Sequence, residues 1–133
     1  MKYMVILDAL ENRAKVIELD DTADVLHACY EHMACECIQL LPVYDRQRLS
    51  PDYVVLTDEE LYGKLCIVNP IASWLYGADV HGATISNNCA ILKEVPEDMD
   101  FMPREEAEKL AAYLNAKADD IFTELIHRAV KTS

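Results

Sequence analysis

Four side chains between residues 69 and 81 have the chemistry of a ligand-binding site: Asn69, Trp74, Tyr76 and His81. The rings of Trp74 and Tyr76 have flat apolar faces and a polar edge, which suit stacking against a base or another planar ligand. The Asn69 amide can donate and accept hydrogen bonds, and loops beside a short helix commonly carry binding residues. These four are therefore our candidate ligand-binding residues.

A purely structural interpretation of the same segment is simpler, and it is the one we favour. Asn69 would cap a short helix that begins at Pro70, because asparagine caps free N–H groups and proline suits the first helical position. Trp74 or Leu75 would enter the core, and Gly77 would end the helix.

Cys35 and Cys37, with His27 and His32 just upstream, are the candidate metal ligands. A zinc site needs about four ligands in tetrahedral geometry, and its paired cysteines are usually separated by two or more residues. One residue separates Cys35 from Cys37, and cysteine in an apolar stretch is commonly a small buried hydrophobe. The run Asp58–Glu60 could hold a divalent cation, but such a run in a turn is usually solvated. We expect no metal site and no cofactor.

Cys89 and His81 could form a nucleophilic pair, which would require an activated thiolate in a partly exposed site. Nothing in the surrounding sequence indicates activation. The chain has no G-x-S-x-G, H-E-x-x-H or Walker-type motif, and its three glycines exclude a glycine-rich phosphate loop. We expect no catalytic residue, and an enzyme with a site near Asn69 and His81 is only an alternative.

The charge balance restricts the partners. The 133 residues carry 24 acidic and 12 basic side chains, a formal net charge of -12. Phosphates and anionic membrane surfaces would be repelled, so direct nucleic-acid or membrane binding is not expected. An acidic mimic of nucleic acid is an alternative, although the acidic residues are scattered rather than arranged in rows.

The remaining composition indicates a cytoplasmic protein. Hydrophobic residues make up 52% of the chain, enough for a core, and no apolar run approaches the ~20 residues that cross a bilayer. The N-terminal apolar stretch is too short for a signal peptide. Five cysteines, an odd number, fit a reduced compartment better than a disulfide framework.

Hydrophobic periodicity predicts the elements that would position these residues. In the first half, residues 3–7 and 13–19 form a hairpin, with the second strand at an edge, and Asp20-Asp21-Thr22 starts a helix that runs to Met33 or Ala34. Further strands are predicted over 35–41, 53–56 and 64–68.

In the second half, the short helix over 70–76 precedes a strand pair or one bent strand over 82–92. Residues 94–100 form an acidic connection, either an extended wrap or a flexible linker. From residue 104 to about 130 the pattern is helical, as one helix or as two broken near Asn115. This stripe could pack on the sheet or pair with a second copy. A dimer seam would use Leu114, Ile121, Phe122 and Leu125.

Three stretches in this order, spanning about residues 3 to 92, carry a resemblance to a known family. They are residues 16–22, residues 54–60 with Gly63-Lys64-Leu65, and Asn69-Pro70-Ile71-Ala72 with Leu75-Tyr76-Gly77 and Gly82. The chain resembles the family catalogued as domain of unknown function 3846. That family occurs in phages, plasmids and conjugative elements of Gram-positive and gut bacteria.

The resemblance implies an accessory protein of a mobile element, and it implies no activity, cofactor or site residue. The chain departs from the family at residues 33–36, Met-Ala-Cys-Glu, where the family often has glycines.

We therefore expect an α+β fold, in which a small, mostly antiparallel sheet is covered by the helix over 21–33, with a short NP-started helix and a C-terminal helix. Residues 1–95 would form the core, and 96–133 an acidic connection and amphipathic helix of the same domain. The expected function is non-enzymatic binding of a protein or small molecule, with a homodimer through the C-terminal helix as one arrangement.

Overall fold

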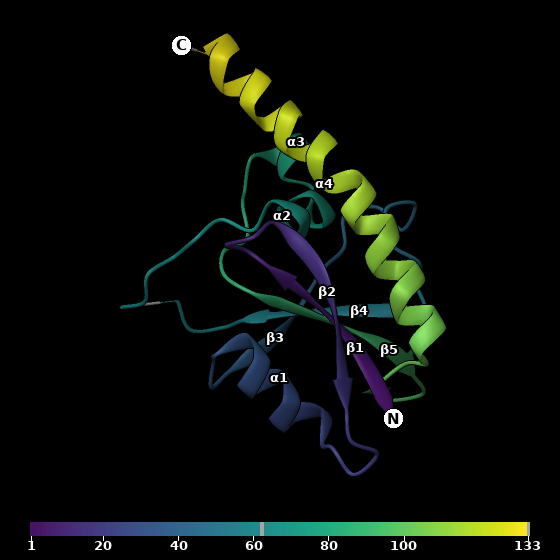
Figure 1. The fold of residues 1–133 in the computed structure, drawn as a ribbon. Coiled ribbons are helices and arrows are strands. Elements are labelled where there is room, and N and C mark those ends of the chain that lie inside the picture. The colour runs from purple at the N-terminus through teal and green to yellow at the C-terminus, as the bar shows by residue number, and fades with distance from the viewer. Residues whose placement is uncertain (62, 133) are drawn as a thin grey trace.

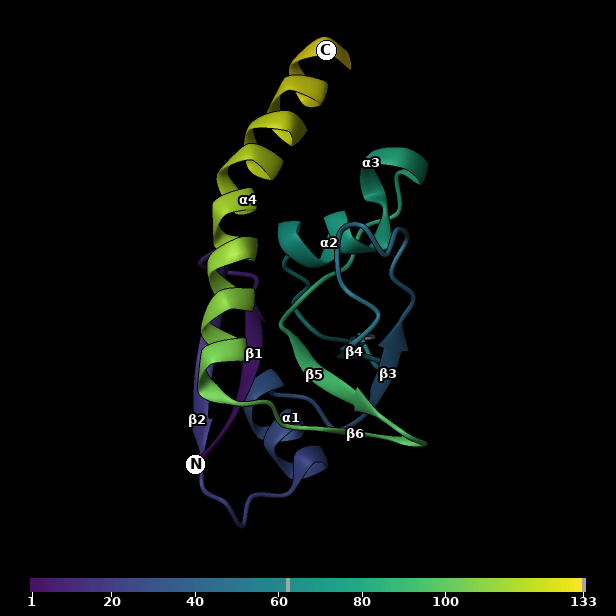
Figure 2. The ribbon, with the colours of Figure 1, turned by 90° about the vertical axis from the view of Figure 1, so that its right-hand side faces the viewer.

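The computed structural model describes residues 1–61 and 63–132, with the side chains of the last helix described as far as Ile121. In this part of the chain, six antiparallel strands form one sheet with helices on both sides (Figures 1 and 2). The strands are β1 (Lys2–Asp8), β2 (Arg13–Leu19), β3 (Ile38–Leu41), β4 (Tyr53–Asp58), β5 (Cys89–Val95) and β6 (Asp98–Asp100). The helices are α1 (Val25–Met33), α2 (Pro70–Tyr76), α3 (Ala78–His81) and α4 (Arg104–Thr132). The predicted α+β class is confirmed.

The strand order across the sheet is β2-β1-β5-β4-β3, and β6 pairs with the far end of β5. The predicted hairpin of the first two strands is present, with Lys2 opposite Leu19 and Asp8 opposite Arg13. It places β2 at one edge and β3 at the other.

Both faces of the sheet are covered. Alternation along β1 sends Val5 and Leu7 to one face and Met4 and Ile6 to the other, and all four are buried. The Val5 face packs against α2 and α4, and the Met4 face packs against α1. The result is a sheet between two helical layers.

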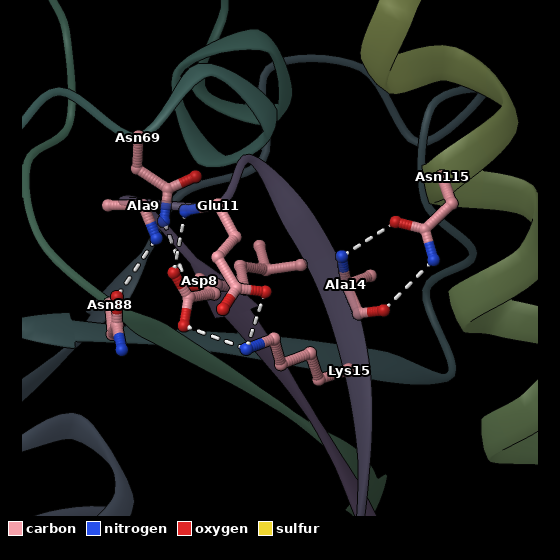
Figure 3. Close-up of polar contacts among 9 residues, drawn as sticks. Asp8, Ala9, Glu11, Ala14, Lys15, Asn69, Asn88 and Asn115 are labelled. Carbon is pink, nitrogen blue, oxygen red and sulfur yellow. Dashed lines mark hydrogen bonds and ion pairs between the residues drawn. The ribbon is translucent and has the colours of Figure 1, made fainter.

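The C-terminal segment is a single helix, so the alternative of two helices is wrong. Asn115, the expected break, instead binds the edge of β2: its Oδ1 accepts from the Ala14 N–H at 2.7 Å and its Nδ2 donates to the Ala14 carbonyl at 2.9 Å (Figure 3). Leu114 and Ile121 are buried against the body. The side chains of Phe122 and Leu125, the other members of the expected dimer seam, lie outside the described residues.

The first helix begins later than predicted. Asp24, rather than the run from Asp20 to Thr22, caps α1 by accepting a hydrogen bond from the His27 N–H at 3.0 Å. Asp20 cannot cap the helix because its carboxylate accepts from the Thr22 N–H and hydroxyl in a preceding turn. After α1, Ala34 takes a left-handed conformation, and the strand predicted from residue 35 begins only at Ile38.

The strand predicted over residues 64–68 does not form. β4 already has β5 on one side and β3 on the other, so the sheet has no free edge beside it. Within the described residues, this segment makes only an isolated bridge between Val68 and Ser86.

The region from 82 to 100 also differs from the prediction. Residues 82–88 form no strand, and β5 begins at Cys89 after Asn87, whose φ of 66° is incompatible with extended backbone. The acidic connection is neither a wrap nor a linker, because β5 continues to Val95 and pairs with β6 through a turn at Glu97.

Candidate functional site

Asn69 lies in the interior of the protein. Its Oδ1 accepts from the Ala72 N–H at 3.1 Å, and Pro70 opens α2, as the structural interpretation predicts. Its Nδ2 donates to the carbonyls of Leu7 and Asn87, each at 3.0 Å. The side chain is 0% exposed, and Figure 3 shows it beside the end of β1. Both amide hydrogens are therefore used inside the fold, and neither is available to a ligand.

Trp74 belongs to a cluster around Arg48. The guanidinium makes two hydrogen bonds to the Asp79 carboxylate, at 2.7 and 2.9 Å, and a third to the Trp74 carbonyl at 2.7 Å. It also lies 5.0 Å from the centre of the Trp74 ring and 5.4 Å from that of Tyr44. Hydrogen bonding with Asp79 raises the pKa of Arg48 above its ordinary value. The arrangement ties the loop after β3 to α2 and α3.

His81 and Tyr76 form the neighbouring contact. The His81 Nε2 lies 2.8 Å from the Tyr76 carbonyl, and its Nδ1 accepts from the Ala83 N–H at 3.1 Å. A neutral ring with its proton on Nε2 satisfies both contacts. The two rings meet edge to face with centres 5.0 Å apart, and the Tyr44 ring lies 6.4 Å from that of His81.

The structure thus gathers Trp74, Tyr76 and His81 at the α2–α3 end and leaves Asn69 buried at the start of α2. Sequence reasoning missed Arg48 and its neighbours, because Arg48 lies 26 residues from Trp74 and 31 from Asp79. Contacts between residues this far apart in the chain leave no spacing pattern in the local sequence.

An open hollow of about 560 Å³ lies on the other face of the sheet, beside α1. Leu26 and Tyr30 of α1 form one wall, and Ile38 and Leu40 of β3 lie across from them. Leu40 stands opposite Leu56 in the ladder, which places it on the face that α1 covers. Leu26 is 44% exposed and Leu40 is 64% exposed. The nine-residue helix leaves this strip of the sheet open to solvent.

A second hollow, of about 430 Å³, continues the first around the start of α1. The two share the lining residues Leu26, Val95, Asp98 and Met99, and together they are called the α1 groove below. Acidic residues stand along its length from the β5–β6 hairpin to the α1 cap. This acidic rim consists of Asp24, Glu94, Glu97, Asp98 and Asp100, all of them exposed.

The α1 groove was not predicted, although its acidic segment was noticed. Leu26 has the helical spacing of a core residue, and Leu40 has the alternation of a strand residue. Whether a neighbour covers them depends on the length of α1 and on the edge position of β3, which periodicity does not encode.

Four of the five cysteines have raised thiol pKa values, the opposite of an activated nucleophile. Burial raises the pKa of Cys29 to about 11 and that of Cys89 to about 12. Burial also raises the pKa of Cys35 and Cys37. Among the described residues, no group of three or more His, Cys, Asp or Glu side chains could hold a metal ion.

Asp58, from the acidic run after β4, is buried and paired. Its Oδ2 lies 2.6 Å from the Lys64 Nζ, and its Oδ1 accepts from the Glu60 N–H. The neighbouring Glu59 and Glu60 are exposed. Asp58 therefore anchors the loop that follows β4.

No family model, curated protein or solved structure matches this chain. None of the described helices is long and apolar enough to cross a membrane.

Proposed function

We propose that the protein is a non-enzymatic binding protein that holds a segment of another protein in the α1 groove. The observation that carries this proposal is the open apolar strip between α1 and β3, where Leu26 and Leu40 remain exposed on a sheet face that is otherwise covered.

The shape of the groove favours a chain segment over a small molecule. A pocket for a small ligand usually buries most of the ligand surface, whereas this groove is open at both Leu26 and Leu40. Exposed apolar strips bordered by polar residues commonly mark contacts between proteins.

A library of random twelve-residue peptides displayed on phage tests this proposal. The library is selected on the wild-type protein, and the enriched peptides are measured against two variants. Leu40→Asp places a charge in the groove, and Leu10→Asp is the matched control, because Leu10 is 78% exposed and does not line the groove. Circular dichroism checks that both variants are folded.

We expect the enriched peptides to bind Leu40→Asp at least about tenfold more weakly than the wild type, since burying an unpaired charge against apolar surface costs more than about 1.4 kcal/mol. Leu10→Asp should bind like the wild type. If no enriched peptide distinguishes Leu40→Asp from Leu10→Asp, the groove is not a docking site.

The cellular setting and oligomeric state complete the proposal. The resemblance supports an accessory protein of a bacterial mobile element, and the odd number of cysteines, five, supports a reduced compartment such as the cytoplasm. A homodimer through α4 is supported by Phe122 and Leu125, which continue the apolar stripe of the sequence beyond Ile121.

A further inference from the structure

The charges of the α1 groove are strongly unbalanced. Five acidic side chains form its rim, and among the described lining residues the one basic side chain is Lys2. None of the five acidic residues forms an ion pair with any other residue that the structure describes, whereas nine ion pairs occur elsewhere in the same residues. The 12 basic side chains of the chain lie almost entirely outside the groove.

Three of the rim carboxylates accept hydrogen bonds from nearby backbone N–H groups. Asp24 accepts from the His27 N–H, and Asp98 and Asp100 accept from the N–H of the residue that follows each. Each of these bonds occupies one carboxylate oxygen and leaves the charge exposed. Glu94 and Glu97 make no side-chain hydrogen bond with the described residues. The rim therefore keeps its negative potential.

The single base in the groove, Lys2, lines the hollow around the start of α1 and not the one beside β3. The Lys2 Nζ lies 5.8 Å from the centre of the Phe101 ring, in the acidic part of the groove. A cation over an aromatic face is stabilised by the ring. The β3 end of the groove is different, because Ile38, Leu40 and Leu56 line it and β3 itself, Ile38–Leu41, carries no charged residue.

We infer that the segment bound in the α1 groove is cationic and bipartite: its apolar residues lie along β3, and its lysine or arginine side chains lie at the acidic rim. This inference rests on the proposed function. Charge complementarity of this kind sets the choice of partner and the association rate, and a net charge of -12 draws cationic segments toward the whole molecule.

The peptide selection tests this inference when it is repeated on two charge variants. The first is the triple variant Glu94→Gln/Glu97→Gln/Asp98→Asn, which neutralises the rim. The second is Glu59→Gln/Glu105→Gln/Asp120→Asn, which removes the same three charges from exposed positions outside the groove. The control separates the effect of the rim from that of net charge.

We expect peptides selected on the wild type and on the control to be enriched in lysine and arginine, and peptides selected on the rim variant to be apolar without that enrichment. Wild-type-selected peptides should bind the rim variant about two- to fivefold more weakly per charge removed, the size of an exposed ion pair. Their affinity for the wild type should fall as salt rises, and this dependence should be nearly lost in the rim variant.

Two results would overturn the inference in different ways. Peptides that depend on Leu40 but show no enrichment in lysine or arginine would leave the proposed function standing and remove the cationic partner. Equal losses in the rim variant and in the control would assign the effect to net charge instead of the groove. A selection that gives no Leu40-dependent peptide would remove the proposed function itself.

Discussion

The Asn69 side chain joins three backbone segments through one amide group. It contacts the end of β1, the turn before β5 and the first turn of α2. Asn69→Ala should lower the free energy of unfolding by about 2–4 kcal/mol, because it leaves buried donors and acceptors without partners. Asn69→Asp should cost at least as much, since it turns a carboxylate toward two carbonyl oxygens.

Denaturant unfolding measures both changes. Asn88→Ala is a suitable control, because the Asn88 side chain accepts one hydrogen bond, from the Ala9 N–H at 2.9 Å (Figure 3), and should cost about 1 kcal/mol. A change below about 0.5 kcal/mol for Asn69→Ala would contradict the structural role of this residue.

The thiols should differ widely in reactivity. Only the thiolate reacts, and with a pKa of about 11 for Cys29 and about 12 for Cys89 at most about one thiol in a thousand is ionised at about pH 8. Cys66 is exposed and should react first with a thiol reagent such as Ellman's reagent. All five cysteines should react after unfolding in urea. Rapid labelling of Cys89 in the folded protein would contradict this prediction and would support a nucleophilic role for Cys89.

Prediction from sequence succeeded where a residue acts on its own neighbours. The Asn69–Pro70 start and Gly77 end of α2 follow from capping chemistry within a few residues. It failed for the Arg48 cluster, because that cluster depends on a loop and a helix meeting in three dimensions. The α1 groove belongs to the same class, since it arises from surface that no element covers.

The α2–α3 junction requires glycine at position 77 for two reasons. Its φ is 95°, and a Cβ placed there would lie 2.7 Å from the Tyr44 Cγ. Gly82, at the end of α3, has a similar φ of 84° but no atom within 4 Å of the added Cβ. Alanine substitutions at Gly77 and Gly82 therefore separate the free-energy cost of the left-handed backbone from the cost of the steric clash with Tyr44.

Gly82→Ala should cost about 1 kcal/mol, the price of a left-handed conformation for a residue with a side chain. Gly77→Ala should cost about 2–4 kcal/mol, since the Tyr44 Cβ and Cγ lie close to the backbone and cannot move away freely. Denaturant unfolding of both variants gives the comparison. Equal costs would mean that the loop carrying Tyr44 shifts without resistance.

At the level of elements, the sequence errors share a cause. The strand predicted over 64–68 contains a suitable apolar run, residues 65–68, but β4 is already paired on both sides. The helix start at Asp20 has suitable residues, but a turn uses its carboxylate first. In each case the local signal was present and a competing contact decided the outcome.

At the scale of the whole molecule, the C-terminal helix packs on the sheet and extends past it (Figures 1 and 2). α4 packs on the sheet through residues that include Leu110 and Leu114, and its last turns extend beyond α3 (Figures 1 and 2). From Leu125 onward the sequence carries Arg128 and Lys131 but no acidic residue, in a chain whose acidic residues outnumber its basic ones twofold. This end is therefore the part of the chain that a second, acidic copy would repel least.

Native mass spectrometry of the full chain and of a chain ending at Ile121 tests the proposed homodimer. We expect the full chain to form a dimer and the shortened chain to be monomeric. The shortened chain should remain folded, because it keeps the α4 residues of the core cluster, Ala107, Leu110, Ala111, Leu114 and Ala118. A dimer that survives the truncation would place the contact elsewhere, and a monomeric full chain would leave α4 as a helix that only covers the sheet.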